Sequence, residues 1–250
     1  EILKSGTVIR TLKRPSVAQG FNRMTWDLRM DPPKFLTDMN PDSAEAGDWR
    51  SRPVGPQVLP GQYAVRLTVA GQSQEQPLTV RIDPTATVTM AELLGQFEQS
   101  TRLFDVISTM IEVERNLGSF KNQVDERSST AKELRGDAAK DLSKASDEEL
   151  VKLDSVRLQL TRPKSDKVPF YSEGPRPVER ALNLMGAIDA GLTPIIEAQR
   201  EYMGDVRRDA QTVIDMVEKQ IDATSARINP LLQALGLPPL VSPPKKPISM

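Results

Sequence analysis

Acidic side chains are the residues of this chain with the clearest potential for chemistry. Glu112 and Glu114 form one close pair, and Asp147, Glu148 and Glu149 form a run of three. Two carboxylates about 5 to 9.5 Å apart can serve as acid and as nucleophile or base in glycoside hydrolysis. Both groups fall on predicted helix surfaces without a pocket signal, so a solvated helix face is the better interpretation.

Histidine and cysteine are both absent from the 250 residues. These side chains supply most zinc and haem ligation, the usual general base near neutral pH and the thiolate nucleophile. The sequence also lacks a nucleophile elbow, a Walker phosphate loop, a dinucleotide fingerprint and a spaced acidic calcium loop. We therefore expect no catalytic residue, no metal site and no cofactor, and interpret the chain as non-enzymatic.

Charge and hydropathy argue against two classes of partner. The chain has 33 Lys and Arg against 34 Asp and Glu, a formal net charge of −1, so no overall field attracts nucleic acid. No stretch approaches the roughly 18 to 20 consecutive apolar residues that a membrane span requires. We expect neither nucleic-acid binding nor membrane insertion.

The first part of the chain, residues 1–84, has the two-residue period of half-buried antiparallel strands. Ser5-Gly6 predicts a tight hairpin turn. In the run 22–29, Trp26 alternates inward with its apolar neighbours and is predicted to be core. Arg29 is predicted to lie on the opposite face, either solvated or paired locally. Later alternating runs, 63–69 and 78–82, complete the prediction of a small β-sandwich.

A long proline-rich loop, residues 31–57, interrupts the predicted strands. Loops of this length are uncommon in compact domains and are often functional or partly disordered. Trp49 lies in this loop beside Arg50, and an exposed Trp next to charges can stack on a sugar or a partner side chain. The alternative is that Trp49 folds back over the sheet edge. Phe35, Trp49 and Arg50 are the candidate partner-binding residues.

After Pro84 the apolar period lengthens to about 3.6 residues, which is typical of helices. Thr89 and Glu92 form a capping box, as do Ser146 and Glu149. Thr193-Pro194 predicts another helix start, Asn229-Pro230 a break or kink, and Gly236 a final end. The predicted helices are long ones over 89–125 and 193–229, with shorter ones within 130–160 and over 177–190.

These patterns predict an α+β chain of two domains, a β-sandwich over 1–84 and an antiparallel helical bundle over 85–237, with a disordered tail over 238–250. The apolar stripes of the long helices leave two interpretations open. An intramolecular core is favoured, because the chain has enough helices to cover the stripes. A monomer is therefore favoured as well. The near-heptad spacing of Phe97, Phe104 and Ile111 is also typical of a dimerisation seam.

Several motifs resemble a known family. Trp26-Asp27-Leu28-Arg29, with Gly20-Phe21-Asn22-Arg23 before it and the run 55–67 after it, resembles the C-terminal region of bacterial sortilin-like proteins, often labelled glycosyl hydrolases with neuraminidase-type repeats. The runs 180–185 and 228–238 are similar to the last two helices of that region. Residues 6–12 also resemble the first hairpin of the immunoglobulin-like domain in flagellar hook-capping proteins.

The resemblance implies an immunoglobulin or fibronectin III-like sandwich that follows a large β-propeller in a secreted or periplasmic bacterial protein. It implies a non-catalytic accessory module that stabilises the propeller or docks a protein partner. We therefore expect the chain to be a piece of a larger protein. The alternatives are a glycan- or peptide-binding module that uses the 31–57 loop, and a helical dimerisation module.

Overall fold

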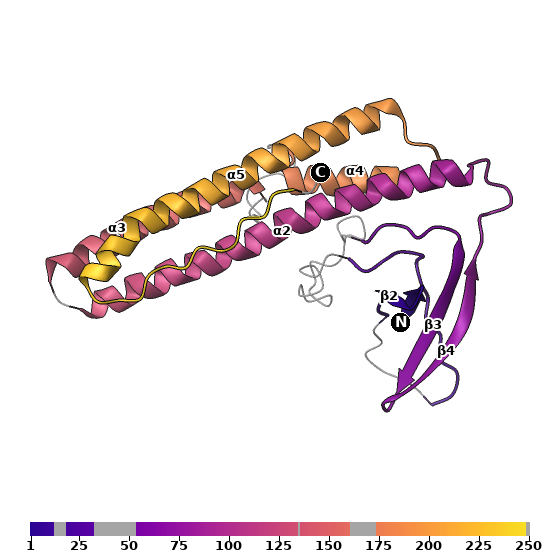
Figure 1. The fold of residues 1–250 in the computed structure, drawn as a ribbon, viewed down its shortest axis with the longest axis horizontal. Helices are drawn as coiled ribbons and strands as arrows, with labels where there is room; N and C mark the ends of the chain where they lie inside the picture. Colours follow the sequence, from indigo (N-terminus) through magenta and orange to yellow (C-terminus); the bar gives the residue numbers. More distant parts are fainter. Residues whose placement is uncertain (13–18, 33–53, 135, 161–173, 249–250) are drawn as a thin grey trace. The chain divides into compact units, whose positions relative to one another are not determined.

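The computed structural model describes residues 1–12, 19–32, 54–134, 136–160 and 174–248. The fold is α+β, with a small antiparallel sheet and four helices in the described part of the chain (Figure 1). The chain divides into two compact units. Unit 1 comprises residues 1–104 and 184–200, and unit 2 comprises residues 105–183 and 201–250.

The sheet of unit 1 has four strands in the order β2-β1-β3-β4, which leaves β2 and β4 at its edges. The strands are β1 (Ile2–Lys4), β2 (Thr7–Arg10), β3 (Gly61–Val69) and β4 (Gln72–Val80). Two-residue turns with positive φ at both positions, Ser5-Gly6 and Ala70-Gly71, close the two hairpins. The predicted hairpin at Ser5-Gly6 is confirmed.

Strand β4 is longer than predicted, and its extra residues are polar. The turn at Ala70-Gly71 keeps β3 and β4 paired in register from Gly61 opposite Val80 to Val69 opposite Gln72. Pro77 lies within β4, a position open to proline because β4 is an edge strand. Backbone pairing therefore extends β4 through a glutamine-rich stretch. No apolar alternation in that stretch predicts a strand.

Only one end of the β3–β4 hairpin reaches the core. A cluster of Ile2, Val58 and Tyr63 is buried, and Trp26 packs against it. The ring centroids of Trp26 and Tyr63 lie 5.7 Å apart. Further along β3 the apolar face is exposed. The exposed fractions are 36% at Val65, 64% at Leu67 and 62% at Val69. The described residues form one sheet, so they do not supply the second sheet of the predicted sandwich.

The run 22–29 is not the predicted strand. It makes a single isolated bridge, from Arg29 to Gln57, and Leu28 adopts a left-handed backbone with φ of 57°. The indole Nε1 of Trp26 donates a hydrogen bond to the carbonyl of Arg29 at 2.9 Å, which folds the segment back on itself. Trp26 therefore packs on the core as predicted, but Met24 and Leu28 remain exposed.

The four helices are α2 (Met90–Glu133), α3 (Asp137–Leu160), α4 (Pro177–Ile188) and α5 (Glu197–Ala234). The capping box before α2 is confirmed, because the Thr89 N–H donates to Glu92 Oε2 at 2.8 Å and the Glu92 N–H to Thr89 Oγ1 at 3.3 Å. Gly236 ends α5 as predicted, with φ of 66° and a Leu237 N–H bond back to Leu232.

Three predicted helix features are wrong. Ser146 and Glu149 do not cap a helix, because both are buried inside the continuous helix α3. Helix α5 begins at Glu197 rather than at Thr193, since Gln199 accepts a hydrogen bond from the Ile196 N–H and caps the first turn there. The same helix continues through Pro230 to Ala234, so the predicted break at Asn229-Pro230 is wrong, whereas a kink there stays a prediction.

Ion pairs and hydrogen bonds join the helices of unit 2. Helix α3 runs antiparallel to α2, as the pairs Lys121–Asp154 and Glu114–Arg157 show, whereas α2 and α5 run in the same direction (Figure 1). Arg180 joins α4 to α5 through Asp209. The helices of unit 2 are therefore not all antiparallel to their neighbours.

No helix of the described residues is long and apolar enough to cross a membrane.

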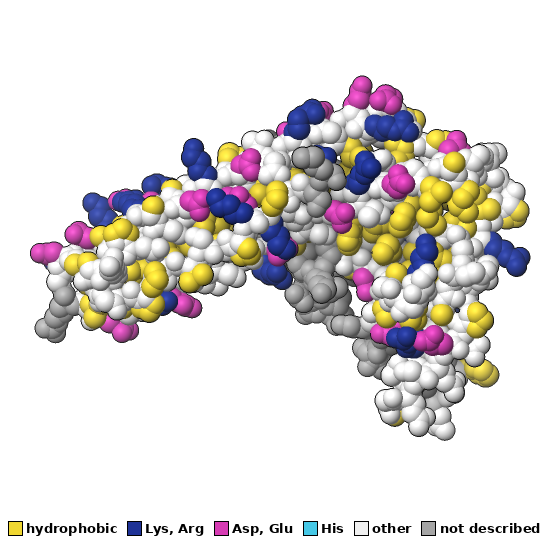
Figure 2. Space-filling model, viewed as in Figure 1, with side chains coloured by type: hydrophobic (Ala, Val, Ile, Leu, Met, Phe, Trp, Pro, Cys, Tyr) yellow, Lys and Arg dark blue, Asp and Glu magenta, His cyan; other side chains and the backbone are white. Residues whose placement is uncertain are grey.

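The C-terminal tail is not disordered through residue 248. Leu240 and Ile248 are 4% and 7% exposed. The tail packs on α2 and α5, where Lys245 pairs with Asp222 of α5 and Lys246 with Glu112 of α2. On the face of the molecule in Figure 2, basic and acidic side chains are interspersed, in keeping with the near-zero net charge.

Glu149 of α3 is a buried carboxylate that several donors of unit 2 hold in place. Its side chain is 2% exposed and accepts hydrogen bonds from Thr224, Gln220, Arg227 and Lys152 at 2.8 to 2.9 Å. Burial acts to raise the pKa of Glu149, but the hydrogen bonds from Lys152, Arg227 and Thr224 outweigh it, so the pKa lies below its ordinary value. The solvated face predicted for this residue is wrong.

Substitution of Glu149 should change how stability depends on pH. A folded-state pKa below the unfolded one of about 4.3 makes the carboxylate stabilising above that value, and this contribution is lost as the pH falls through the folded pKa. We expect Glu149→Gln to lower the free energy of unfolding by roughly 2 kcal/mol at neutral pH and to flatten its decline in acid. Urea unfolding monitored by far-UV circular dichroism at several pH values measures both effects.

The matched control is Asp147→Asn, since the Asp147 side chain is 62% exposed two positions away on the same helix. It should change the free energy of unfolding by less than about 0.5 kcal/mol. Equal acid sensitivity of the wild-type chain and the Glu149→Gln variant would contradict the stabilising role of this carboxylate.

Candidate functional site

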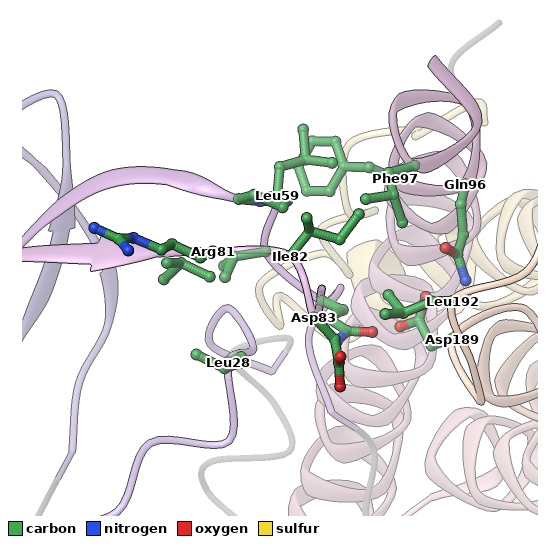
Figure 3. Close-up of a pocket in the computed structure, with 14 residues that line it drawn as sticks. Leu28, Leu59, Arg81, Ile82, Asp83, Gln96, Phe97, Asp189 and Leu192 are labelled. Carbon is green, nitrogen blue, oxygen red and sulfur yellow. The ribbon is translucent and has the colours of Figure 1, made fainter. Parts of the chain in front are cut away.

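Unit 1 contains a cleft of about 190 Å³ where the end of the β3–β4 hairpin meets the start of α2 (Figure 3). Strand β4 continues into Arg81, Ile82 and Asp83 along one wall, and the first turns of α2 form another. The segment after α4 supplies Asp189 and Leu192. The remaining lining residues are Leu28, Gln57, Val58, Leu59, Pro60, Val80, Leu93, Gln96 and Phe97.

Apolar side chains form most of the cleft wall. Figure 3 shows Leu59 and Ile82 on the strand side and Phe97 and Leu192 on the helix side, all bordering the same space. Phe97 belongs to the stripe that the period of α2 predicts, yet it remains only half-buried. The cleft therefore offers an incompletely covered apolar surface to a ligand or partner.

A buried ion pair lies beside this apolar wall. The Asp189 side chain is 3% exposed, and its Oδ2 atom accepts a hydrogen bond from Arg29 Nη1 at 2.7 Å. Its other oxygen accepts a hydrogen bond from Ser100 Oγ of α2 at 2.5 Å. Burying a carboxylate is costly unless it is paired and hydrogen-bonded. Both oxygens of Asp189 are satisfied within unit 1.

Gln96 closes the helix side of the cleft. Its side-chain amide nitrogen donates to the carbonyl of Ile188, the last residue of α4, and to the carbonyl of Gly191 at 2.8 Å. Carbonyls at the end of a helix have no partner within the helix. Gln96 therefore satisfies two carbonyls beyond the reach of the helical hydrogen bonds and fixes the turn that carries Asp189 and Leu192.

Arg29 also links the cleft to the stem of the 31–57 loop. The same Nη1 atom that pairs with Asp189 donates to the carbonyl of Gly55 at 3.2 Å. The two sides of the stem are joined by a Met30 N–H bond to Pro56 O at 2.9 Å. A Cβ atom at Gly55 would lie 2.4 Å from the Met30 carbonyl oxygen, so only glycine fits this close approach.

The rim of the cleft carries two charged residues of opposite sign. Hydrogen bonds from the hydroxyl and the N–H of Thr85 hold the pKa of Asp83 below its ordinary value, so Asp83 is ionised at neutral pH. Arg81 is exposed, and its side chain extends away from the cleft in Figure 3. Neither of these charges is buried within the cleft.

The three predicted partner-binding residues, Phe35, Trp49 and Arg50, lie outside the described residues. The predicted acidic groups are not gathered into one site. Glu112 pairs with Lys246, Glu114 with Arg157, and Glu148 with Arg227. Among the described residues, no group of three His, Cys, Asp or Glu side chains is placed to hold a metal ion.

Sequence reasoning missed the polar residues of the cleft. Gln96 and Ser100 lie on the same helical stripe as Leu93 and Leu103, at spacings of three and four residues. Two polar residues on an apolar stripe are a signal of a buried hydrogen-bonding site. Asp189 has no such signal, because its partners are distant in sequence.

Asp189→Asn should destabilise unit 1, because it leaves the partly buried Arg29 without its countercharge. We expect a loss of about 3 kcal/mol in the free energy of unfolding. Urea unfolding followed by Trp26 fluorescence in a Trp49→Phe background reports on this unit. Asp27→Asn is the matched control, since Asp27 also pairs with an arginine, Arg10, but its side chain is 44% exposed.

The control should lose less than about 1 kcal/mol. Losses of the same size in the two variants would show that the buried pair has no special role in holding the cleft together.

No protein-family model, no curated protein and no solved structure matches this chain. The resemblance to the C-terminal region of sortilin-like proteins therefore remains an expectation drawn from the motifs themselves.

Proposed function

We propose that this chain is a non-catalytic interaction module that docks an apolar side chain of a protein partner in the cleft of unit 1. The observation that carries the proposal is the combination of an open apolar wall with internally satisfied polar groups. Asp189, Ser100 and Gln96 are occupied by contacts within unit 1. What the cleft offers to a partner is mainly hydrophobic surface.

The size of the cleft favours a side chain over a whole cofactor or sugar. Pockets for small molecules and cofactors usually have volumes of about 300 to 1,000 Å³, and the cleft has about 190 Å³. A dry cavity of about 150 Å³ lined by Leu, Ile and Phe can hold benzene in another protein. One aromatic or branched aliphatic side chain is therefore the occupant of suitable size.

The state of the buried carboxylates argues against catalysis. A general acid or base must be within reach of the proton that it transfers. Asp189 is held by Arg29 and Ser100, and Glu149 accepts hydrogen bonds from four side chains. These contacts are those of residues that position chain segments.

We place this module at the C-terminus of a secreted or periplasmic bacterial protein, after a β-propeller that is its first partner. In this proposal unit 1 belongs to an immunoglobulin-like sandwich and unit 2 to a helical bundle. One contact supports the placement. Trp26 of the Trp-Asp motif packs edge-on against Tyr63 of the Pro-Gly-x-Tyr motif, so the two sequence signatures of the resemblance meet in one core.

A second candidate function is glycan or peptide binding by the 31–57 loop. Its support is the stem of the loop, where Arg29, Met30, Gly55 and Pro56 are joined by hydrogen bonds. A fixed stem reduces the conformational entropy that a loop loses when it binds a ligand. Loss of binding in Trp49→Ala, with the cleft intact, would favour this alternative.

Leu192→Arg should weaken binding of the β-propeller that the resemblance places before this chain. Leu192 is half-buried at the cleft, so a charged side chain there opposes entry of an apolar group. We expect at least a tenfold rise in Kd, which corresponds to about 1.4 kcal/mol, measured by isothermal titration calorimetry. Leu94→Arg is the matched control, because Leu94 is 44% exposed on α2 and lies outside the cleft.

Equal affinities of the Leu192→Arg and Leu94→Arg variants would contradict docking in the cleft. Hydrolysis of a glycoside by the purified chain would contradict the non-catalytic assignment.

A further inference from the structure

The C-terminal tail lies in a groove between α2 and α5 of unit 2. From its start to its end, the tail contacts progressively earlier residues of both helices. Leu240 contacts Asn229 and Ile248 contacts Gln211 on α5, and on the α2 side Val241 contacts Gln123. The tail therefore runs antiparallel to both helices along much of their length in this unit (Figure 1).

The tail is almost fully extended. From Asn229 to Gln211, α5 spans about 27 Å at a rise of 1.5 Å per residue. The tail covers this distance from Leu240 to Ile248, which requires about 3.4 Å per residue and is close to the limit for a polypeptide chain. Prolines at 243, 244 and 247 favour such an extended conformation.

Side chains of the groove bind the backbone of the tail. Four tail N–H groups donate to side-chain oxygens of the helices, and the prolines between them have no N–H that needs a partner. This pattern recognises an extended backbone. The donor and acceptor pairs are Leu240 to Asn229 Oδ1 at 2.7 Å, Val241 to Gln123 Oε1 at 2.9 Å, Lys246 to Glu218 Oε1 at 3.1 Å and Ile248 to Gln211 Oε1 at 3.1 Å.

Side chains of the tail also fit the groove in an ordered sequence. Leu240 and Ile248 are buried at the two ends, while Val241 is 67% exposed. Between them, Lys245 pairs with Asp222 at 2.8 Å and Lys246 with Glu112 at 2.6 Å. The groove thus accommodates two apolar residues separated by prolines and a lysine pair.

We propose that this groove is a peptide-binding site for an extended, proline-containing segment with paired lysines, and that its intermolecular occupant is the tail of a second copy of the chain. The tail provides the sequence that the groove complements in backbone, charge and apolar ends. Exchange of an identical element between two copies preserves the contacts that the element makes beyond its hinge, so it is a low-cost route to a dimer. This inference concerns unit 2 and does not depend on the cleft of unit 1.

A disulfide can test the exchange, because the chain has no natural cysteine to compete. Ser225 Oγ of α5 and Ser242 Oγ of the tail lie 3.1 Å apart, close enough for cysteine sulfurs at these positions to bond after small side-chain rotations. The double variant S225C/S242C should close an internal disulfide. An equimolar mixture of the full-length single variants S225C and S242C should form a bridged heterodimer under mild oxidation, detected by mass spectrometry.

A mixture of S225C with V241C is the matched control, since the Val241 side chain is directed to solvent next to Ser242. We expect at least ten times more heterodimer with S242C than with V241C. Adding Leu240→Asp to the S242C chain should remove this excess, and adding Val241→Asp should leave it unchanged.

Two results would overturn the proposal. If the double variant closes internally but the mixture gives no more heterodimer than the V241C control, the tail does not exchange between copies. If the double variant fails to close, the groove does not hold the tail.

Discussion

Burial of the Asp189 carboxylate is the constraint on which the arrangement of unit 1 depends. A buried carboxylate without a partner would cost several kcal/mol. Arg29 and Ser100 supply the two donors, and they are 160 and 89 residues away in sequence. The segment after α4, the first turns of α2 and the stem of the 31–57 loop must therefore come together for the carboxylate to be satisfied. The cleft is the space beside this junction. Its wall is mainly apolar because the polar side chains near it, Asp189, Ser100 and Gln96, are already hydrogen-bonded within the junction.

Glu149 has the same role in unit 2. It joins α3 to three residues of α5 that are spaced three or four apart, on one face of that helix. An apolar contact tolerates small shifts along a helix, whereas a buried carboxylate with several donors fixes the register of the two helices. Each unit thus contains one buried acid that determines how its segments are aligned, and hydrophobic burial around it supplies most of the stability.

Features that depend on local sequence could be predicted. Ser5-Gly6 forms its turn, Thr89 caps α2 and Gly236 ends α5, because in each case the partners lie within a few residues. Predictions failed where a distant partner competes with the local preference. Ser146 and Glu149 have the spacing of a capping box. The Glu149 carboxylate instead accepts a hydrogen bond from Thr224 of α5 in the interface between α3 and α5.

The candidate site was less predictable than the fold. Gln96 and Ser100 signal a buried polar site by lying on an apolar stripe. Arg29 was expected to be solvated or paired locally, not with a partner 160 residues away, and Asp189 was not singled out. Their pairing depends on a chain reversal after α4 that no local pattern specifies. The tail was equally hard to predict, because its prolines and lysines are typical of disordered segments until a groove with matching oxygens is present.

The proline in the edge strand β4 has a consequence for how copies of the chain can associate. An edge strand normally presents a row of free backbone donors and acceptors on which another strand can add. Pro77 has no N–H, so this row is interrupted near the middle of β4. Addition of a strand from another copy along the β4 edge is therefore disfavoured, although Val65, Leu67 and Val69 of the neighbouring strand β3 are exposed.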